Sequence, residues 1–96
     1  MNDNNKKYVI KIWRGDKIII FDVIPWTRKN KKYDVYKDNK YILWFGDVRY
    51  SHYYDKIGTY KDLNHNDEKR KEAYYKRHGL TDDIYWAKWW SNNILW

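Results

Sequence analysis

The strongest constraint on this chain is a pair of apolar segments near its start, joined by a short turn. Residues 8–13 and 17–24 are rich in β-branched and aromatic side chains, and Arg14-Gly15-Asp16 between them has the composition of a tight turn. The pattern predicts a β-hairpin. Apolar residues occupy both faces of the second segment, which predicts a central strand covered on both sides. Residues 1–7 are polar and are predicted to be flexible.

A second pair of segments predicts another hairpin. Residues 33–37 and 40–45 flank Asp38-Asn39, a two-residue turn that tolerates positive φ. Pro25 ends the preceding strand, and residues 26–32 form a charged connection. The first half of the chain therefore predicts an antiparallel sheet of about four strands.

The clearest helical signal lies in the second half. Asn66 can cap the first turn, and acidic residues from Asp67 onward suit the N-terminal end of a helix. Gly79 can take the left-handed backbone conformation that ends many helices. A helix is therefore predicted from Asp67 to His78. A second helix is predicted from a cap at Thr81 to about residue 91. Residues 48–63 show no clean period, and we expect either an irregular aromatic segment or one short helix over residues 51–57.

These elements predict a single α+β domain over residues 1–96, with two hairpins packed by two C-terminal helices. The apolar content is unusual, because Tyr, Trp and Phe make up 21% of the residues. The core is therefore expected to consist largely of aromatic rings, with surplus Tyr and Trp at the rim, where they serve interfaces or base stacking. The chain contains no cysteine, which fits a reducing compartment.

The charge is unevenly distributed. The formal net charge is +7, and residues 1–40 carry eleven Lys or Arg against five Asp. A basic half predicts an acidic partner, either nucleic acid or an anionic protein surface. A composition rich in Lys, Asn, Ile and Tyr is also what an AT-rich genome imposes, and the sequence does not separate these explanations.

No catalytic or cofactor motif is evident. His52, His65 and His78 lie thirteen residues apart, which is not the helical spacing of a zinc motif. The chain has four glycines and two serines, too few to suggest a phosphate-binding loop or a serine nucleophile. Arg14-Gly15-Asp16 is also a receptor-binding tripeptide, although a tight turn needs the same residues. We expect a non-catalytic protein with no metal and no cofactor.

Two groups of residues are candidates for binding. Basic residues interleaved with aromatic rings predict nucleic-acid contact, the alternative being a solvated loop and a helix whose arginines cover tyrosines. These candidates are Arg28, Lys29, Lys31, Lys32, Arg70 and Arg77. The apolar C-terminal residues predict contact with a partner or packing on the sheet. These candidates are Trp86, Trp89, Trp90, Leu95 and Trp96.

Three stretches also carry a resemblance to a known family. They are residues 40–47, which end in Phe-Gly-Asp, the pattern H-x-D-x-x-R-x-x-x-Y-x-x-R-H-G over residues 65–79, and the S-x-x-x-L-W ending. From about residue 32 onward the chain resembles a family of small, functionally uncharacterised proteins of giant DNA viruses. The matching positions are Asp67, Arg70, Tyr74, Arg77, His78, Gly79, Ser91, Leu95 and Trp96. The first hairpin lies outside the resemblance. Trp86, Lys88, Trp89 and Trp90 stand where the family usually has small residues.

The resemblance implies a viral protein located in the virion, the host cytoplasm or a viral factory, and it implies no activity. The favoured hypothesis is a minor capsid or core protein that contacts other viral structural proteins. The alternative is an accessory protein that binds DNA or RNA, and an inhibitor of a host protein fits equally well. An oligomer is compatible with the sequence, and no membrane partner is expected.

Overall fold

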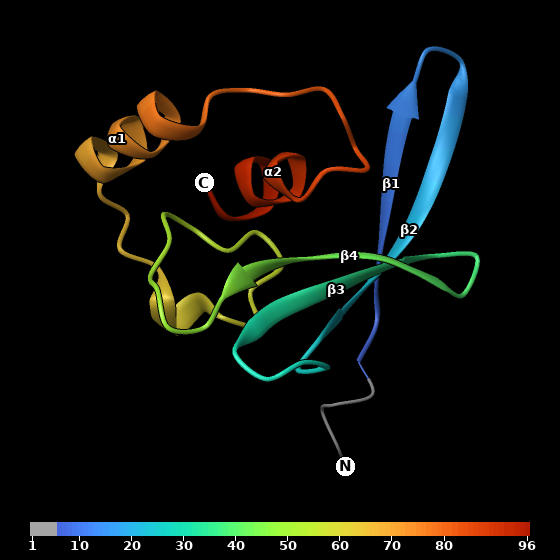
Figure 1. The fold of residues 1–96 in the computed structure, drawn as a ribbon, viewed down its shortest axis with the longest axis horizontal. Helices are drawn as coiled ribbons and strands as arrows, with labels where there is room; N and C mark the ends of the chain where they lie inside the picture. Colours follow the sequence, from blue (N-terminus) through green and yellow to red (C-terminus); the bar gives the residue numbers. More distant parts are fainter. Residues whose placement is uncertain (1–5) are drawn as a thin grey trace.

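The computed structural model describes residues 6–96 and has an α+β fold: a four-stranded antiparallel sheet followed by two C-terminal helices with an aromatic cluster (Figure 1). The α+β class, the four-stranded antiparallel sheet and the two C-terminal helices are as predicted. The predicted flexible segment 1–7 lies mostly outside the described residues. Among residues 6–96, no helix has the length and apolar content needed to cross a bilayer.

The sheet is a simple meander of two hairpins. Its strand order is β1-β2-β3-β4, and each strand is antiparallel to its neighbours. The four predicted strands are confirmed, with ends shifted by up to two residues. Their bounds are β1 (Tyr8–Arg14), β2 (Lys17–Pro25), β3 (Lys31–Lys37) and β4 (Lys40–Asp47).

The expectation that β2 is covered on both sides along its length is wrong for its first half. β2 pairs with β3 only from Asp22 to Pro25. Residues 17–20 therefore extend past β3 as part of a projecting two-stranded arm (Figure 1). Within this arm Ile18 and Ile20 are 40% and 49% exposed. Residues from Phe21 onward lie over the core, where Phe21 and Val23 are buried.

The core lies between the sheet and the last helical segment. Trp90 is completely buried, its ring meets Phe21 edge-on at 5.2 Å, and its Nε1 donates to the carbonyl oxygen of Ile84. Phe45 of β4 lies 5.8 Å from the Trp90 ring and stacks on Tyr33 of β3 at 5.2 Å. The expected aromatic core is therefore present, and β3, β4 and residue 90 form its centre.

The segment between β4 and the first helix is irregular, which confirms the first of the two alternatives predicted for it. It contains a 3₁₀ turn, η2 (Lys61–Leu63), and the alternative short helix over residues 51–57 is wrong. A bridge between His52 and Asn64 closes the segment on itself, through hydrogen bonds from His52 N–H to Leu63 and from His65 N–H to His52. Backbone hydrogen bonds between residue 52 and residues 63–65 therefore hold this segment in place of a helix.

The helix α1 (Glu68–His78) confirms the first predicted helix, with its cap one residue later than expected. Asp67 accepts from the N–H groups of Lys69 and Arg70, whereas Asn66 takes a positive φ of 54° before the cap. The helix does not rest on the sheet. Its buried residue, Tyr74, stacks on Trp96 at 4.4 Å and donates to Asn92 Oδ1. α1 therefore packs on the end of the chain.

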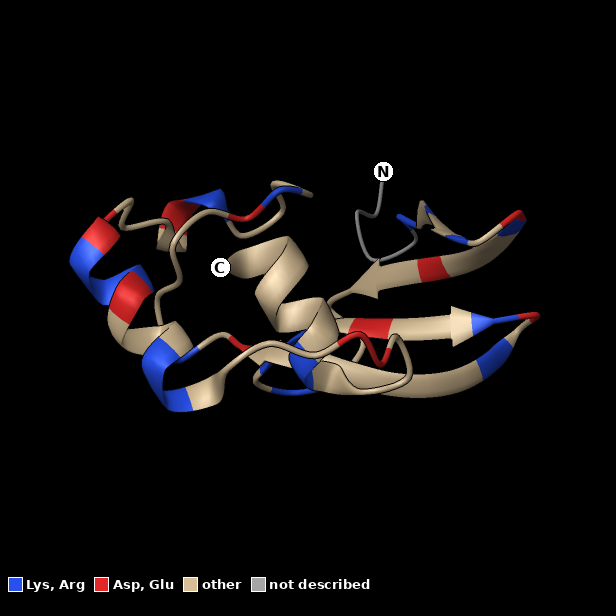
Figure 2. Cartoon of the chain, turned by 90° about the horizontal axis from the view of Figure 1, so that it is seen from above, with Lys and Arg blue, Asp and Glu red and all other residues tan. Residues whose placement is uncertain are grey.

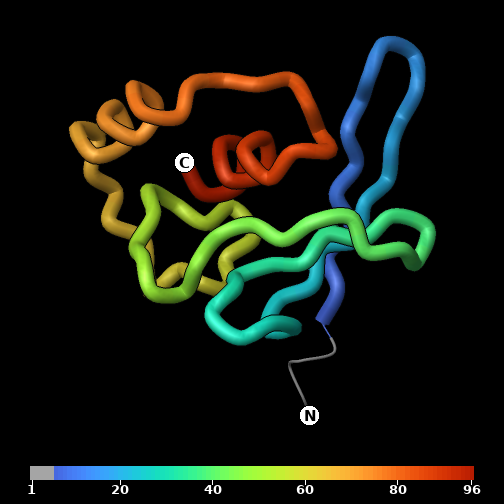
Figure 3. The backbone as a smooth tube through the Cα atoms, viewed as in Figure 1, coloured from blue at the N-terminus to red at the C-terminus, as the bar shows by residue number. Residues whose placement is uncertain are grey.

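The second predicted helix is wrong in its first half. Residues 79–86 form an arch from α1 past β1, and α2 (Ala87–Trp90) begins only afterwards (Figure 3). Thr81 accepts from the N–H of Asp83, whose carboxylate accepts from the N–H of Tyr85, so these polar side chains stabilise successive turns rather than a helix N-terminus. The helix continues into a π-helical turn, η3 (Ser91–Leu95).

Candidate binding groove along β4

A groove of about 570 Å³ on the surface follows β4. Its floor contains seven consecutive residues, 41–47. Side chains of a strand alternate between the two faces of a sheet, so a hollow over one face would touch every second residue. Contact with all seven indicates that the groove follows the free edge of the strand.

The wall of the groove comes from segments distant in sequence. Residues 85–88 and the end of the chain contribute most of it, Tyr74 and His78 of α1 contribute the rest, and residues 50–51 close one end. The wall exists because the buried Trp90 anchors α2 on the sheet beside β4. The lining is mainly aromatic and aliphatic.

The backbone along this edge is unpaired. β4 is the last strand of the sheet and bonds only to β3. Within residues 6–96, no hydrogen bond from another segment reaches the backbone of residues 41–46. Their outward N–H and C=O groups are therefore available to a partner. The β3–β4 register also shifts between Val35 and Tyr36, which leaves an irregularity within this edge.

Three exposed aromatic rings of the groove each form a cation–π contact with a basic side chain. The Arg28 guanidinium lies 4.3 Å from the centre of the Tyr41 ring, and the Lys31 ammonium lies 3.8 Å from that of Trp44. On the opposite wall Lys88 lies 4.4 Å from Trp86, which is 50% exposed. These contacts hold large rings at the surface in fixed positions.

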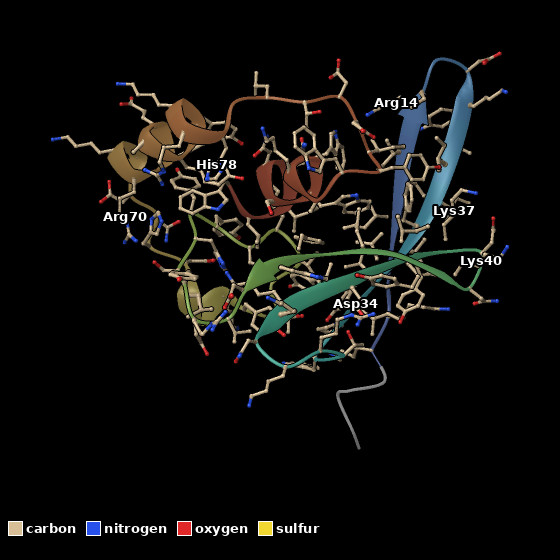
Figure 4. All side chains as sticks on the ribbon, in the orientation of Figure 1. Arg14, Asp34, Lys37, Lys40, Arg70 and His78 are labelled. Atoms are coloured by element: carbon tan, nitrogen blue, oxygen red, sulfur yellow. The ribbon has the colours of Figure 1, made fainter. Side chains whose placement is uncertain are left out.

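The charge available along the groove is positive. Its one acidic lining residue, Asp47, accepts from Arg49 at 2.6 Å, and this pairing holds the pKa of its carboxyl well below the usual range. Lys88, Lys40 and Arg70 form no salt bridge with any of residues 6–96. Figure 4 places Lys40 near the tip of the β3–β4 hairpin and Arg70 on α1, on opposite sides of the molecule. Neither residue lines the groove itself. Arg70 donates to Ser51, which lines one end of the groove.

Below one end of the groove lies a buried polar network centred on Lys32, which is 2% exposed. Its ammonium donates to the Tyr50 carbonyl oxygen and lies 2.7 Å from His52 Nδ1. The other ring nitrogen, Nε2, lies 2.7 Å from the Asn64 side-chain oxygen, an acceptor, so Nε2 carries the proton and Nδ1 accepts from Lys32. Burial lowers the pKa of Lys32 to about 8. Burial and the Lys32 charge lower that of His52 to about 4.

The same network includes a buried carboxylate. Asp55 accepts from the Tyr33 hydroxyl and from the N–H groups of Ile57 and Tyr60. Burial, followed by the hydrogen bond to Asp55, raises the pKa of Tyr33 well above its ordinary value. These bonds join β3 to the irregular segment and pair the Asp55 carboxylate with the Tyr33 hydroxyl, so the network has a structural role. Within residues 6–96, the Tyr60 hydroxyl and His65 Nε2 are buried without a hydrogen-bond partner.

The predicted partner-binding residues separate into three groups. Trp90 and Leu95 are buried in the core, so of the two predicted alternatives, partner contact or packing, they are packing residues. Trp89 and Trp96 are half-buried against the core. Trp86 is exposed in the groove wall and remains a candidate contact. A helical stripe including Trp86 does not form, since the helix begins after it.

The predicted nucleic-acid residues do not form one surface. Arg28 donates to the buried Asp34, and Lys31 lies 3.9 Å from Asp47. The prediction of Lys32 as a phosphate contact is wrong, because its ammonium lies inside the network described above. Three exposed candidates remain without a salt bridge to any of residues 6–96; these are Lys29, Arg70 and Arg77.

The three histidines occupy separate environments. His52 belongs to the buried network, His65 packs on Trp96 at 5.2 Å, and His78 lies against Tyr74 at 4.5 Å. No group of three metal-ligating side chains occurs within residues 6–96. At the tip of the first hairpin Arg14 donates to the Asp82 carbonyl oxygen, so this arginine is engaged within the chain.

The groove itself was not expected from the sequence. The sequence pattern predicts Tyr41 and Trp44 in a strand, but it contains no sign that this strand lies at the edge of the sheet. Fold and groove together define a small α+β domain with a groove along its edge strand. Searches of protein-family models, of curated proteins and of solved structures find no match to the chain.

Proposed function

We propose that this chain is a non-catalytic structural component that acts through protein–protein contacts, with the β4 groove as its main binding site. The observation that carries the proposal is the groove itself, which combines an unpaired strand edge with exposed aromatic rings. Aromatic side chains held in place by their neighbours are typical of interface centres. With the resemblance to a viral family, this favours a minor capsid or core protein of a virus particle.

The proposal is supported by the difference between the groove and the buried polar network. Asp55, His52 and Lys32 are the obvious titratable cluster, but all three are buried and hydrogen-bonded within the fold. The exposed features of the groove are rings, backbone groups and cations. Such features bind and orient a partner.

Two measurements test the proposal. Quantitative mass spectrometry of particles purified from cells infected with the virus that encodes the chain should find it at a fixed copy number. A photo-crosslinking amino acid at Trp86 should then capture a structural protein, whereas one at Trp13, 65% exposed on the first hairpin, should capture much less. Absence from the particles would reject the virion role, and equal capture at both positions would reject the groove as the main site.

Nucleic-acid binding is the second candidate, and the cations of α1 favour it. Lys69, Arg70, Lys71, Lys76 and Arg77 lie on this helix at the end of the molecule opposite the β3–β4 hairpin tip (Figure 2). Gel-shift titration at two ionic strengths should give affinities that fall steeply with salt if they contact phosphates. Replacing both Arg70 and Arg77 by Gln should reduce that slope by roughly two. No retarded band at low salt would exclude this candidate.

A further inference from the structure

The free edge of β4 and the cations beside it specify the kind of segment that fits the groove. We propose that the groove binds an extended, acidic peptide segment of a partner protein, which joins the sheet as a fifth strand beside β4. This inference rests on the proposed protein-binding function and names the chemistry of its partner.

The geometry of the floor favours an extended segment. Residues 41–47 line the groove without interruption, and a strand rises about 3.4 Å per residue, so the floor is roughly 24 Å long. An extended segment of about seven residues matches that length. It would also supply partners for the outward N–H and C=O groups of β4. A helix satisfies its own backbone groups and would leave those of β4 unpaired.

The charges specify an acidic segment. Lys88 lies in the groove wall, Lys40 directly precedes the lining residue Tyr41, and Arg70 donates to the lining residue Ser51. None of the three has a carboxylate partner in residues 6–96. Asp47 is already paired with Arg49, so it offers little attraction to a basic segment. Carboxylates spaced along a bound strand would meet these three cations.

The aromatic wall of the groove indicates which residues lie between the acidic residues of the bound segment. Side chains of an added strand alternate in direction, so every second residue would face Trp86 and Tyr85 across from β4. Apolar side chains at those positions would cover rings that are exposed in the free chain. The expected segment alternates acidic and apolar residues and lacks proline, which cannot donate to the ladder.

The other edge of the sheet does not share these features. β1 carries Lys11 and Arg14, both exposed, and charged side chains on an edge oppose the addition of a strand. It also lies on the projecting arm, away from α2 and the end of the chain (Figure 1). The acidic-strand proposal therefore applies to β4 alone.

The test begins with selection of twelve-residue peptides from a random display library on the full chain. Enriched sequences should be acidic, should alternate apolar residues and should lack proline. The Lys88→Glu variant should bind the best synthetic peptide about tenfold more weakly, whereas Lys61→Glu, an exposed lysine outside the groove, should bind within about twofold. No enrichment, basic sequences, or equal effects of the two variants would overturn the proposal.

Backbone methylation then tests the strand pairing directly. Two versions of the peptide carry N-methyl groups at odd or at even positions. Because only alternate residues of an added strand bond to β4, one version should lose binding and the other should retain it. Equal behaviour of the two versions would overturn strand addition. If Trp86 still crosslinks to a partner in that case, the protein-binding function stands and only the fifth strand fails.

Discussion

The two hairpins of the sheet are both rich in aromatic and β-branched residues, but their surroundings differ. Trp13 in β1 and Ile20 in β2 are exposed, whereas Tyr33 in β3 and Phe45 in β4 are buried. The difference comes from residues much later in the chain, because Trp90, Ile94 and Leu95 pack over β3, β4 and the inner part of β2. Burial of an apolar strand is therefore determined by what the C-terminal segment covers.

The largest expected effect comes from removing a buried ring beside α2. Phe45→Ala should lower the free energy of unfolding by about 3–5 kcal/mol, because it leaves a cavity against Tyr33 and Trp90. Trp13→Ala on the projecting arm should change it by less than about 0.5 kcal/mol. Urea unfolding followed by circular dichroism measures both. Similar losses for the two variants would mean that the arm is also packed.

A pH effect tests the network that joins β3 to residues 50–64. The pKa of His52 is about 4 in the fold and near 6.5 when unfolded, so the unfolded chain binds this proton more tightly. Stability should therefore fall as the pH falls from about 6.5 to 4, by roughly 3 kcal/mol from this group, and level off below.

The matched variants for this effect are two histidine replacements. His52→Gln should remove the fall in stability between pH 6.5 and 4 that comes from residue 52. His78→Gln, which replaces an exposed histidine, should leave that fall unchanged. Unfolding free energies of all three proteins across pH 4–7.5 give the comparison. A His52→Gln profile parallel to that of the unchanged chain would contradict the neutral, lysine-bonded histidine.

Alanine substitutions at two glycines separate the cost of a packing clash from the cost of backbone strain. Gly46 at the end of β4 and Gly15 at the tip of the first hairpin have φ of 77° and 64°. A Cβ at Gly46 would lie 2.7 Å from Lys32 Cδ and 3.0 Å from Leu95 Cδ1, whereas one at Gly15 meets nothing within 4 Å. Gly46→Ala should therefore cost about 2 kcal/mol more than Gly15→Ala in thermal or urea unfolding. Equal costs would show that strain alone matters.

The smallest expected effect concerns the outer face of the arm. Ile20→Thr should change the unfolding free energy by less than about 0.5 kcal/mol, because Ile20 is about half exposed and threonine suits a strand. Urea unfolding at two protein concentrations is the measurement. A loss above about 1.5 kcal/mol, or one that depends on concentration, would mean that this face is covered in solution.

Local patterns predicted the strands, the turn at Asp38-Asn39 and the helix ending at Gly79, because each depends on neighbours in sequence. They failed over residues 81–86, where Thr81 and Asp83 bond to the backbone two residues ahead and stabilise turns instead of a helix. They also could not separate the core residue Trp90 from the exposed Trp86, since that depends on where α2 lies against the sheet.

The candidate site was harder to predict for the same reason. Lys32 and Arg28 belong to one basic run, but the first enters a buried network and the second pairs with Asp34. The partners of Lys32 lie at residues 50–52, whereas Asp34 lies only six residues after Arg28, on β3. The groove needs the edge of β4, residues 85–88 and α1 together, and no short pattern contains that combination.

The burial of Lys32 makes this amine an internal reporter. In the folded chain an acylating reagent near neutral pH should label the exposed lysines and spare Lys32, whose ammonium is enclosed by the Tyr50 carbonyl oxygen and the His52 ring. Loosening of residues 50–64 would open this enclosure while the sheet stays intact. Mass-spectrometric labelling at Lys32 would then follow the local opening of that segment separately from the global unfolding of the domain.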